Sequence, residues 1–254
     1  RAYDLPDATR QARGTAMANL LTLDPDERIV CVLNHPADVS DGYVVLATAG
    51  GTVKRLALAQ FATARARGIH GITLAEGDEL VGAVRTSGHD DLLLVSTRGR
   101  ALVFGEGEIR ASGRSSGGIM GLRLQAGDRL AAIDVAAPNR AAILLLADGS
   151  GKRVSVASFA KCGRGSRGRI ATRAGQAAVS GLAVVREDWG ILAWTQHGAV
   201  IRLTAGSIPM RSRHAGGVII VRPAAGDAIV GAAGIDPVVA TEMARAGDGT
   251  AEEA

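Results

Sequence analysis

The sequence predicts an all-β fold built as a radial array of short-stranded blades, because three markers recur with a period near 50 residues. The hairpin-turn glycines, separated by 48, 50 and 49 residues, are Gly51, Gly99, Gly149 and Gly198. The loop glycines, separated by 50, 50 and 49 residues, are Gly68, Gly118, Gly168 and Gly217. The apolar residues that close the second hairpin strand, separated by 48, 50 and 49 residues, are Phe61, Ile109, Phe159 and Ile208. Such a repeat favours propeller blades or a related array over a sandwich or an α/β domain.

One complete copy of the repeat runs from Leu92 to Val135. Two apolar runs on either side of a turn at Gly99 indicate a β-hairpin, and a basic, glycine-rich loop from Arg110 to Gly118 follows. Two more strand-like runs are separated by a Gly127-Asp128 turn. The four expected strands are Leu92–Val95, Ala101–Phe104, Ile119–Leu124 and Leu130–Val135.

The other copies follow in the same order. Ala2–Leu5 is expected to be the last strand of a hairpin begun upstream, so we expect the chain to be a piece of a longer polypeptide. Residues 1–235 are expected to form an N-terminally truncated domain with about five blades. Strands are then expected at Ala18–Leu23 and Ile29–Leu33. Three further hairpins are expected to pair Tyr43–Thr48 with Val53–Leu56, Ile143–Ala147 with Lys152–Val156, and Ile191–Thr195 with Val200–Leu203.

Charge divides the chain into two parts. Residues 236–254 hold five acidic residues and one basic residue, whereas residues 1–235 hold 28 basic and 20 acidic residues, a net of +8. We therefore expect a basic β domain over residues 1–235 and an acidic, disordered tail over residues 236–254. A basic body suggests a polyanionic partner, although charge serves solubility as well.

The basic residues follow the repeat. Arginine stands beside glycine in the loop after each hairpin, and further cations lie on the second hairpin strands. Equivalent loops of a radial array share one rim, so these cations are expected to form a belt that binds the phosphate backbone of duplex DNA. Aromatic residues make up only 3% of the chain, which argues against base stacking on single strands. The alternative is that the arginines only keep the turns exposed to solvent and bind no partner. The predicted DNA-binding residues are Arg10, Arg13, Lys54, Arg55, Arg65, Arg67, Arg100, Arg110, Arg114, Lys152, Arg153, Arg164, Arg167, Arg202, Arg211 and Arg213.

Other functional classes have little support in the sequence. Cys31 and Cys162 lie 131 residues apart without a CxxC pattern, which argues against a zinc site and a disulfide scaffold. The five histidines have no ligand spacing, and no P-loop or nucleophile motif is present. Trp189 and Trp194 are interpreted as core residues. We expect no catalytic residue, metal or cofactor in this chain, no membrane span, and a reducing, cytoplasmic location.

Several of these segments resemble the C-terminal domain of the A subunit of bacterial DNA gyrase, which belongs to the type IIA topoisomerase family. The resemblance runs from Ala2 to about Ile235 and keeps the order of the repeats. The segments that carry it are Tyr3–Arg10, Ala12–Gly14, Asn19–Leu21, Ala47–Arg55, Gly77–Gly82 and Gly216–Ile219.

The resemblance implies a β-pinwheel, a propeller-like ring whose blades exchange strands and which wraps DNA with positive handedness. The parent enzyme would be an ATP-hydrolysing type II topoisomerase that introduces negative supercoils. ATP and Mg²⁺, the gyrase B subunit and a second gyrase A subunit would be bound by regions outside this chain, near the nucleoid. The catalytic tyrosine would also lie elsewhere, and Tyr3 and Tyr43 are interpreted as strand residues.

The family's box motif, a Gln, a basic residue, Arg-Gly-Gly, a basic residue and Gly, is expected upstream of Arg1. Cys162–Gly168 matches it at four of seven positions, so it is either a second, degenerate box or an ordinary blade loop. Two other functions stay open. One is the C-terminal domain of the topoisomerase IV C subunit, with decatenation as its activity, and the other is a propeller scaffold that binds acidic proteins.

Overall fold

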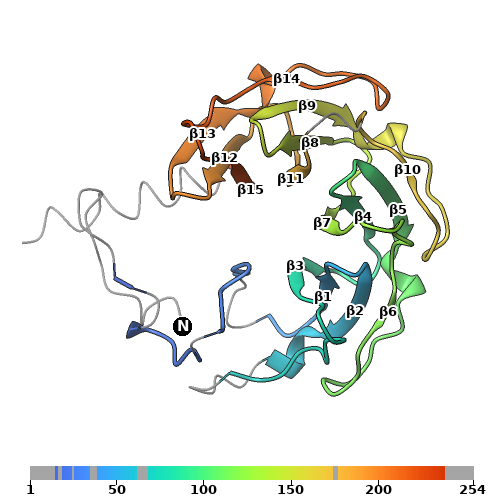
Figure 1. Ribbon diagram of the computed structural model, residues 1–254. Coiled ribbons are helices and arrows are strands. Elements are labelled where there is room, and N and C mark those ends of the chain that lie inside the picture. The colour runs from blue at the N-terminus through green and yellow to red at the C-terminus, as the bar shows by residue number, and fades with distance from the viewer. Residues whose placement is uncertain are drawn as a thin grey trace, which may run out of the picture.

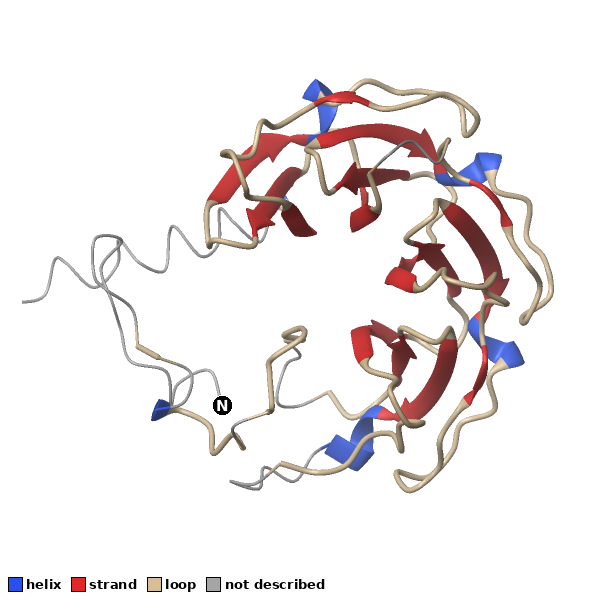
Figure 2. Ribbon diagram, in the orientation of Figure 1, coloured by secondary structure: helices blue, strands red, loops and turns tan. Residues whose placement is uncertain are grey.

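The computed structural model describes residues 15–16, 19–24, 26–34, 39–61, 68–173 and 177–237. Its strands form four antiparallel sheets that stand side by side along an arc (Figure 1). Short 3₁₀ helices follow the second strand of each hairpin and lie on the outer side of the arc (Figure 2). They are η3 (Leu58–Phe61), η4 (Glu106–Glu108), η5 (Val156–Ser158) and η6 (Ala205–Ser207). The predicted all-β pinwheel architecture is confirmed.

Each sheet is centred on one of the predicted hairpins. The turn glycines Gly51, Gly99, Gly149 and Gly198 have φ between +75° and +87°, a region that glycine enters without steric cost. Apolar runs on both sides of each turn then pair as antiparallel strands. The hairpins are β1 (Tyr43–Thr48) with β2 (Thr52–Ala57), β4 (Asp91–Ser96) with β5 (Arg100–Gly105), β8 (Ala141–Leu146) with β9 (Ser150–Ser155), and β12 (Gly190–Thr195) with β13 (Val200–Thr204).

Every hairpin also carries an inner strand on the concave side of the arc (Figure 1). This strand follows its own hairpin along the chain and pairs with the first hairpin strand, as β7 does with β4. The inner strands are β3 (Leu80–Thr86), β7 (Leu130–Val135), β11 (Val179–Val185) and β15 (Ile229–Ile235).

Three sheets have an outer strand that comes from the next repeat. β6 (Ile119–Met120) follows the second hairpin but pairs with β2 of the first sheet, through Thr52 with Met120 and Val53 with Ile119. In the same way β10 (Arg169–Ile170) joins β5, and β14 (Val218–Ile219) joins β9. Neighbouring blades therefore exchange strands, which is the arrangement that distinguishes a pinwheel from an ordinary propeller.

The outer strands are shorter than the sequence predicts. The expected strand Ile119–Leu124 ends at Met120, because the amides of Gly121 and Leu122 both donate to the carbonyl oxygen of Gly51, at 2.8 and 3.1 Å. The chain turns there and hooks over the hairpin turn. Gly99 and Gly149 accept the same pair of hydrogen bonds in the next two sheets.

The core lies between successive sheets and is aliphatic. In the second and third sheets the first hairpin strands, β4 and β8, are buried on both faces, which explains why their sequences are continuous apolar runs instead of alternating patterns. Leu92 and Leu94 pack towards the first sheet, whereas Leu93 and Val95 pack towards the third.

Two predictions for the N-terminal repeat are wrong within the described residues. Ile29–Leu33 is not a strand, and Val32 is 79% exposed. Residues 19–23, the described part of the expected strand Ala18–Leu23, are not a strand either. An inner strand pairs with the first hairpin strand of its own repeat. Among the described residues this repeat has no such hairpin strand, so Ile29–Leu33 lacks a partner. Ala2–Leu5 and most of the expected tail lie outside the described residues, so the domain boundaries and the five-blade count stay predictions.

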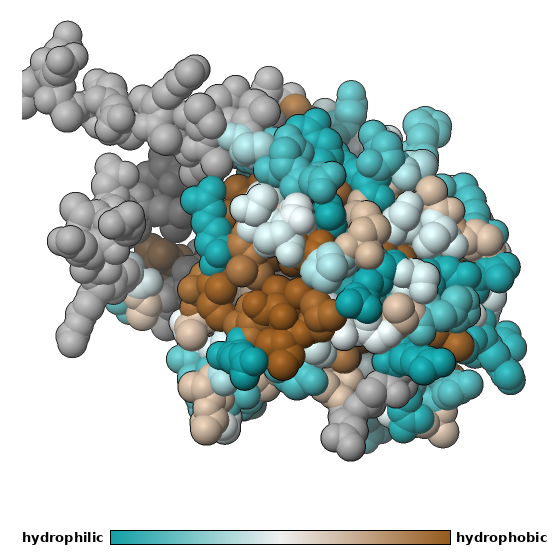
Figure 3. Space-filling model, turned by 90° about the horizontal axis from the view of Figure 1, so that it is seen from above, coloured by the Kyte–Doolittle hydropathy of each residue, from teal (hydrophilic) through white to brown (hydrophobic). Residues whose placement is uncertain are grey.

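The fourth sheet has one open face. It contains three strands among the described residues, and an apolar area is visible on this side of the molecule (Figure 3). Trp194 is 37% exposed, Val200 64% and Val230 46%. The prediction that Trp194 fills the core is therefore wrong, whereas Trp189 is half-buried and packs against the core between the third and fourth sheets.

Candidate nucleic-acid interface

Three loops of equal length carry the chain from a hairpin to the preceding sheet. These crossover loops are residues 109–118, 159–168 and 208–217, and they follow the outer circumference of the arc (Figure 1). Each one docks through an equivalent main-chain hydrogen bond. The amides of Ser112, Cys162 and Arg211 donate to the carbonyl oxygens of Arg55, Val103 and Arg153, at 3.0, 2.9 and 2.8 Å.

Five predicted contact residues are exposed, and four of them lie in the crossover loops. Among the residues that the structure describes, none of the five forms an ion pair with a carboxylate. Their charges are therefore available to an anion in solution. These residues are Arg110, Arg114, Arg167, Arg202 and Arg211.

Arg164 and Arg213 hold neighbouring loops together. They occupy equivalent positions, four residues before a loop glycine. Nη1 of Arg164 donates to the Met120 carbonyl oxygen at 2.5 Å, and Nη1 of Arg213 donates to the equivalent carbonyl of Ile170 at 3.0 Å. Each arginine thus ties its own loop to the end of the preceding outer strand. Arg100 has a similar role, because its Nε and Nη2 donate to the carbonyl oxygens of Arg167 and Gly168.

Four predicted contact residues have buried or largely buried side chains. The exposed fractions of Lys54, Lys152 and Arg153 are 1%, 0% and 8%. The Arg55 side chain is 12% exposed, and its guanidinium carbon lies 4.4 Å from the centre of the Tyr43 ring. These side chains are directed into the protein and not towards the rim, so they do not belong to the exposed contact surface.

The buried lysines have depressed pKa values. Burial lowers the pKa of Lys54, because an apolar environment disfavours the ammonium ion. Burial, followed by the nearby charges of Arg211 and Arg213, lowers the pKa of Lys152 to about 8.

The structure adds three exposed arginines that were not predicted as contact residues. Arg123, Arg173 and Arg222 each stand five residues after a loop glycine, 50 and 49 residues apart, and all three are exposed. The Arg123 amide donates to the Ser166 carbonyl oxygen at 3.0 Å, which places Arg123 beside the next crossover loop. Their signal in the sequence is the same 50-residue recurrence, on the C-terminal side of the loop glycine instead of the N-terminal side.

The remaining predicted residues, Arg10, Arg13, Arg65 and Arg67, lie outside the described residues. In the part of the chain that the structure does describe, no group of three or more His, Cys, Asp or Glu side chains is placed to hold a metal ion. Over the same residues, no helix has the length and apolar character that crossing a membrane requires.

A scan against protein-family models gives one match that covers most of the chain. The model is described as DNA gyrase C-terminal domain, beta-propeller, and it matches residues 1–33, 42–87, 90–137, 147–186 and 191–236. The chain belongs to this family.

Curated relatives support the same family membership. The chain is 37% identical over 234 residues to the DNA gyrase A subunit of Mycolicibacterium smegmatis, and the match covers 91% of the chain and 28% of that relative. It is 34% identical over 255 residues to the DNA gyrase A subunit of Escherichia coli, with 100% of the chain and 29% of that relative covered. The chain therefore spans less than a third of the length of these gyrase subunits.

Two solved structures share the fold. A DNA gyrase A C-terminal domain superimposes with a TM-score of 0.81 at 22% identity, over 89% of this chain and 76% of the other. A DNA topoisomerase IV C-terminal domain gives a TM-score of 0.80 at 24% identity, over 92% and 74%. The fold is thus common to the C-terminal domains of DNA gyrase A and DNA topoisomerase IV, and the fold alone does not distinguish between these two enzymes.

Proposed function

We propose that this gyrase-family domain binds duplex DNA along its outer circumference and bends it into a wrap of positive handedness. The wrap would let the parent gyrase introduce negative supercoils at the expense of ATP, with Mg²⁺, the B subunit and a second A subunit acting outside this chain. The observation that carries the proposal is the row of exposed arginines on successive crossover loops and directly after successive outer strands. The hydrogen bond from the Arg123 amide to Ser166 places Arg123 beside the arginines of the second crossover loop.

The mechanism is electrostatic and mechanical. Guanidinium groups neutralise phosphates and release counterions, which favours binding without sequence preference. Smooth bending of a 20–30 base-pair segment by 40–90° costs roughly 1–6 kcal/mol, and contacts on several blades are needed to offset that cost. Cross-blade hydrogen bonds from Arg164 and Arg213 stiffen the surface against which the DNA bends.

The test is the salt dependence of binding to plain duplex DNA. Replacing Arg123, Arg173 and Arg222 together by glutamine should lower the slope of log K against log salt by about 2–3, since each neutralised phosphate contributes about 0.9. The matched control is Arg186→Gln, because Arg186 is exposed but already paired with Asp188 at 3.3 Å, in the turn between β11 and β12. An unchanged slope in the triple variant would exclude these arginines from DNA contact.

A topoisomerase IV subunit is the second candidate, because the two solved folds match almost equally well. Supercoiling and decatenation assays on the full-length protein, assembled with its ATPase partner, would separate the two activities. The protein-scaffold alternative predicts that the domain leaves the topology of a bound DNA circle unchanged.

A further inference from the structure

Two lysines occupy equivalent interior positions in the first and third sheets. Lys54 pairs with Leu46 across the first hairpin, and Lys152 pairs with Leu144 across the third. In the second sheet the same position holds Leu102, which pairs with Leu94. All three side chains are buried, at 1%, 0% and 2% exposure. Leucine therefore fills this place adequately, and the lysines require another explanation.

The lysine ammonium groups bind the main chain of the crossover loops. Nζ of Lys54 donates to the carbonyl oxygens of Arg114 and Ser116, at 2.9 and 2.7 Å. Nζ of Lys152 donates to the carbonyl oxygens of Ser212, Arg213 and Ala215, at 3.0, 3.0 and 2.7 Å. Neither lysine has an ion pair with a carboxylate among the described residues. A buried ammonium ion without a counter-charge is costly, so its contacts with the loop are the compensation.

These contacts fix the direction of the peptide groups. In a trans peptide the N–H points opposite to the C=O, and the described residues contain no cis peptide. Each carbonyl that faces a buried lysine therefore turns the amide of the following residue away from that lysine. No described residue accepts a hydrogen bond from any of these amides. They belong to Ser115 and Gly117 in the first crossover loop, and to Arg213, His214 and Gly216 in the third.

We propose that Lys54 and Lys152 are positioning residues that turn main-chain amides of two crossover loops outward, where they bind the phosphodiester groups of DNA. The inference rests on the proposed function and deepens it, since it names a second set of phosphate contacts beside the arginines. Outward amides on a glycine-containing loop are well suited to phosphate oxygens.

The second crossover loop provides an internal contrast. It packs on the cluster that contains Leu102 and has no lysine at this position, and two of its amides are used within the protein. The Arg164 amide donates to Glu108 Oε2 at 2.8 Å, and the Gly165 amide donates to the Gly121 carbonyl oxygen at 2.7 Å. This loop, which includes the box-like segment Cys162–Gly168, is therefore expected to contribute less through its main chain.

The experiment is amide hydrogen exchange of the full chain, with and without plain duplex DNA. In the wild type, bound DNA should slow exchange at Ser115, Gly117, His214 and Gly216. Lys152→Met should abolish this protection in the third loop and weaken DNA binding about tenfold, as expected when hydrogen bonds to charged phosphates are lost. Leu102→Met introduces the same side chain at the equivalent position of the second sheet. It should leave the protection of the loop amides and the DNA affinity unchanged.

A comparison with loop arginine variants separates this role from simple loss of charge. Lys152→Met keeps Arg211 and Arg213, yet it should lose DNA protection of the loop amides, whereas Arg211→Gln should weaken binding and retain that protection. If Lys152→Met does not fold, Lys54→Met tests the same claim at the first loop.

Wild-type loop amides that exchange equally fast with and without saturating DNA would overturn the inference. A wild-type chain that does not bind DNA would instead overturn the proposed function. Exchange rates measured without DNA would still report, in that case, whether Lys152 orders its loop.

Discussion

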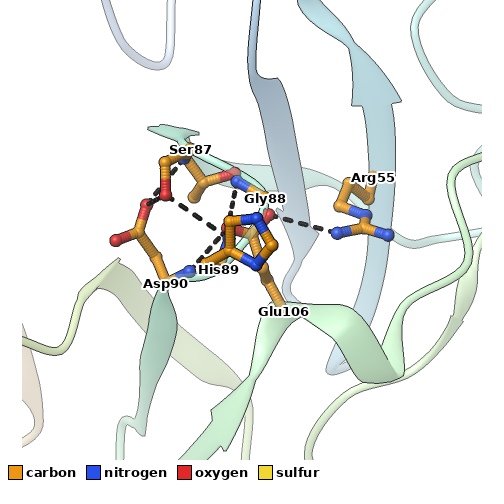
Figure 4. A network of polar contacts seen from close by, with 7 residues as sticks. Arg55, Ser87, Gly88, His89, Asp90 and Glu106 are labelled. Atoms are coloured by element: carbon orange, nitrogen blue, oxygen red, sulfur yellow. Dashed lines mark hydrogen bonds and ion pairs between the residues drawn. The ribbon is translucent and has the colours of Figure 1, made fainter.

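Replacing Glu106 by glutamine should destabilise the junction between the first and second sheets. The Glu106 carboxylate is fully buried and accepts hydrogen bonds on both oxygens (Figure 4). Oε1 accepts from the amides of Gly88 and Asp90, at 2.8 and 2.9 Å. Oε2 accepts from Thr86 Oγ1 at 2.6 Å and from Arg55 Nη1 at 3.4 Å. Every group around this carboxylate is a donor.

Glutamine has the same shape but offers only one acceptor oxygen. If that oxygen faces the two amides, the glutamine NH₂ faces Thr86 and the Arg55 guanidinium, and a donor then meets a donor. Breaking a buried ion pair by removing one partner costs about 3–5 kcal/mol. At roughly 2–4 °C per kcal/mol for a domain of about 150–250 residues, the melting temperature should fall by roughly 6–20 °C.

Urea and thermal unfolding, followed by circular dichroism, would measure this change. The control is Glu187→Gln, because Glu187 pairs with Arg153, the equivalent of Arg55 two repeats later, but its side chain is 76% exposed. Because the Glu187 carboxylate is exposed, water can solvate it and replace it at the Arg153 guanidinium, so Glu187→Gln should cost less than Glu106→Gln. If Glu106→Gln changed the free energy of unfolding no more than Glu187→Gln does, the buried network would not be what joins these two sheets.

Three further predictions concern stability. Gly149→Ala should lower the free energy of unfolding by at least about 1–2 kcal/mol in denaturant titrations, because φ is +81° and the new Cβ would lie 2.2 Å from the Val221 carbonyl oxygen; Gly107→Ala, with open space around it, should be close to neutral. Burial raises the pKa of Asp134 to about 6 from 3.8, so the free energy of unfolding should fall as pH rises through this window, and Asp134→Asn should flatten that dependence. The pKa of Lys152, lowered to about 8 from 10.5, means that the unfolded chain binds more protons between these values; stability should therefore rise with pH there, and a rise that persists in Lys152→Met would assign it to another group.

Local signals were enough to predict the four hairpins and one inner strand, β7. A hairpin is specified by a turn glycine with positive φ and the two apolar runs beside it, all within about a dozen residues. The inner strand β7 has the same bounds, Leu130–Val135, as the sequence predicts. The sheet that an outer strand joins is decided by a contact far along the chain, such as Val53 with Ile119. No periodicity within Ile119–Leu124 specifies that partner, nor the turn that ends the strand after two residues.

The site was predicted less well than the fold, because basic residues were assumed to be exposed. Side chains alternate along a strand, so Lys54 shares a face with the buried Leu56, and Lys152 shares a face with the buried Val154. That alternation would have identified both lysines as interior residues. Arg164 and Arg213 show a second reason. These arginines recur at the same position of the repeat, and the recurrence was interpreted as a DNA contact. In the structure each of them joins its own loop to the preceding outer strand.

The central claim is that the arginine-rich circumference bends duplex DNA into a wrap of defined handedness. The most direct measurement is the linking number of a nicked DNA circle that is sealed by ligase while the chain is bound, at low salt. We predict a shift towards positive linking difference that grows with protein concentration and is lost in the variant with Arg123, Arg173 and Arg222 replaced by glutamine. A linking number equal to that of protein-free DNA, at saturating occupancy, would contradict wrapping even if the affinity were high.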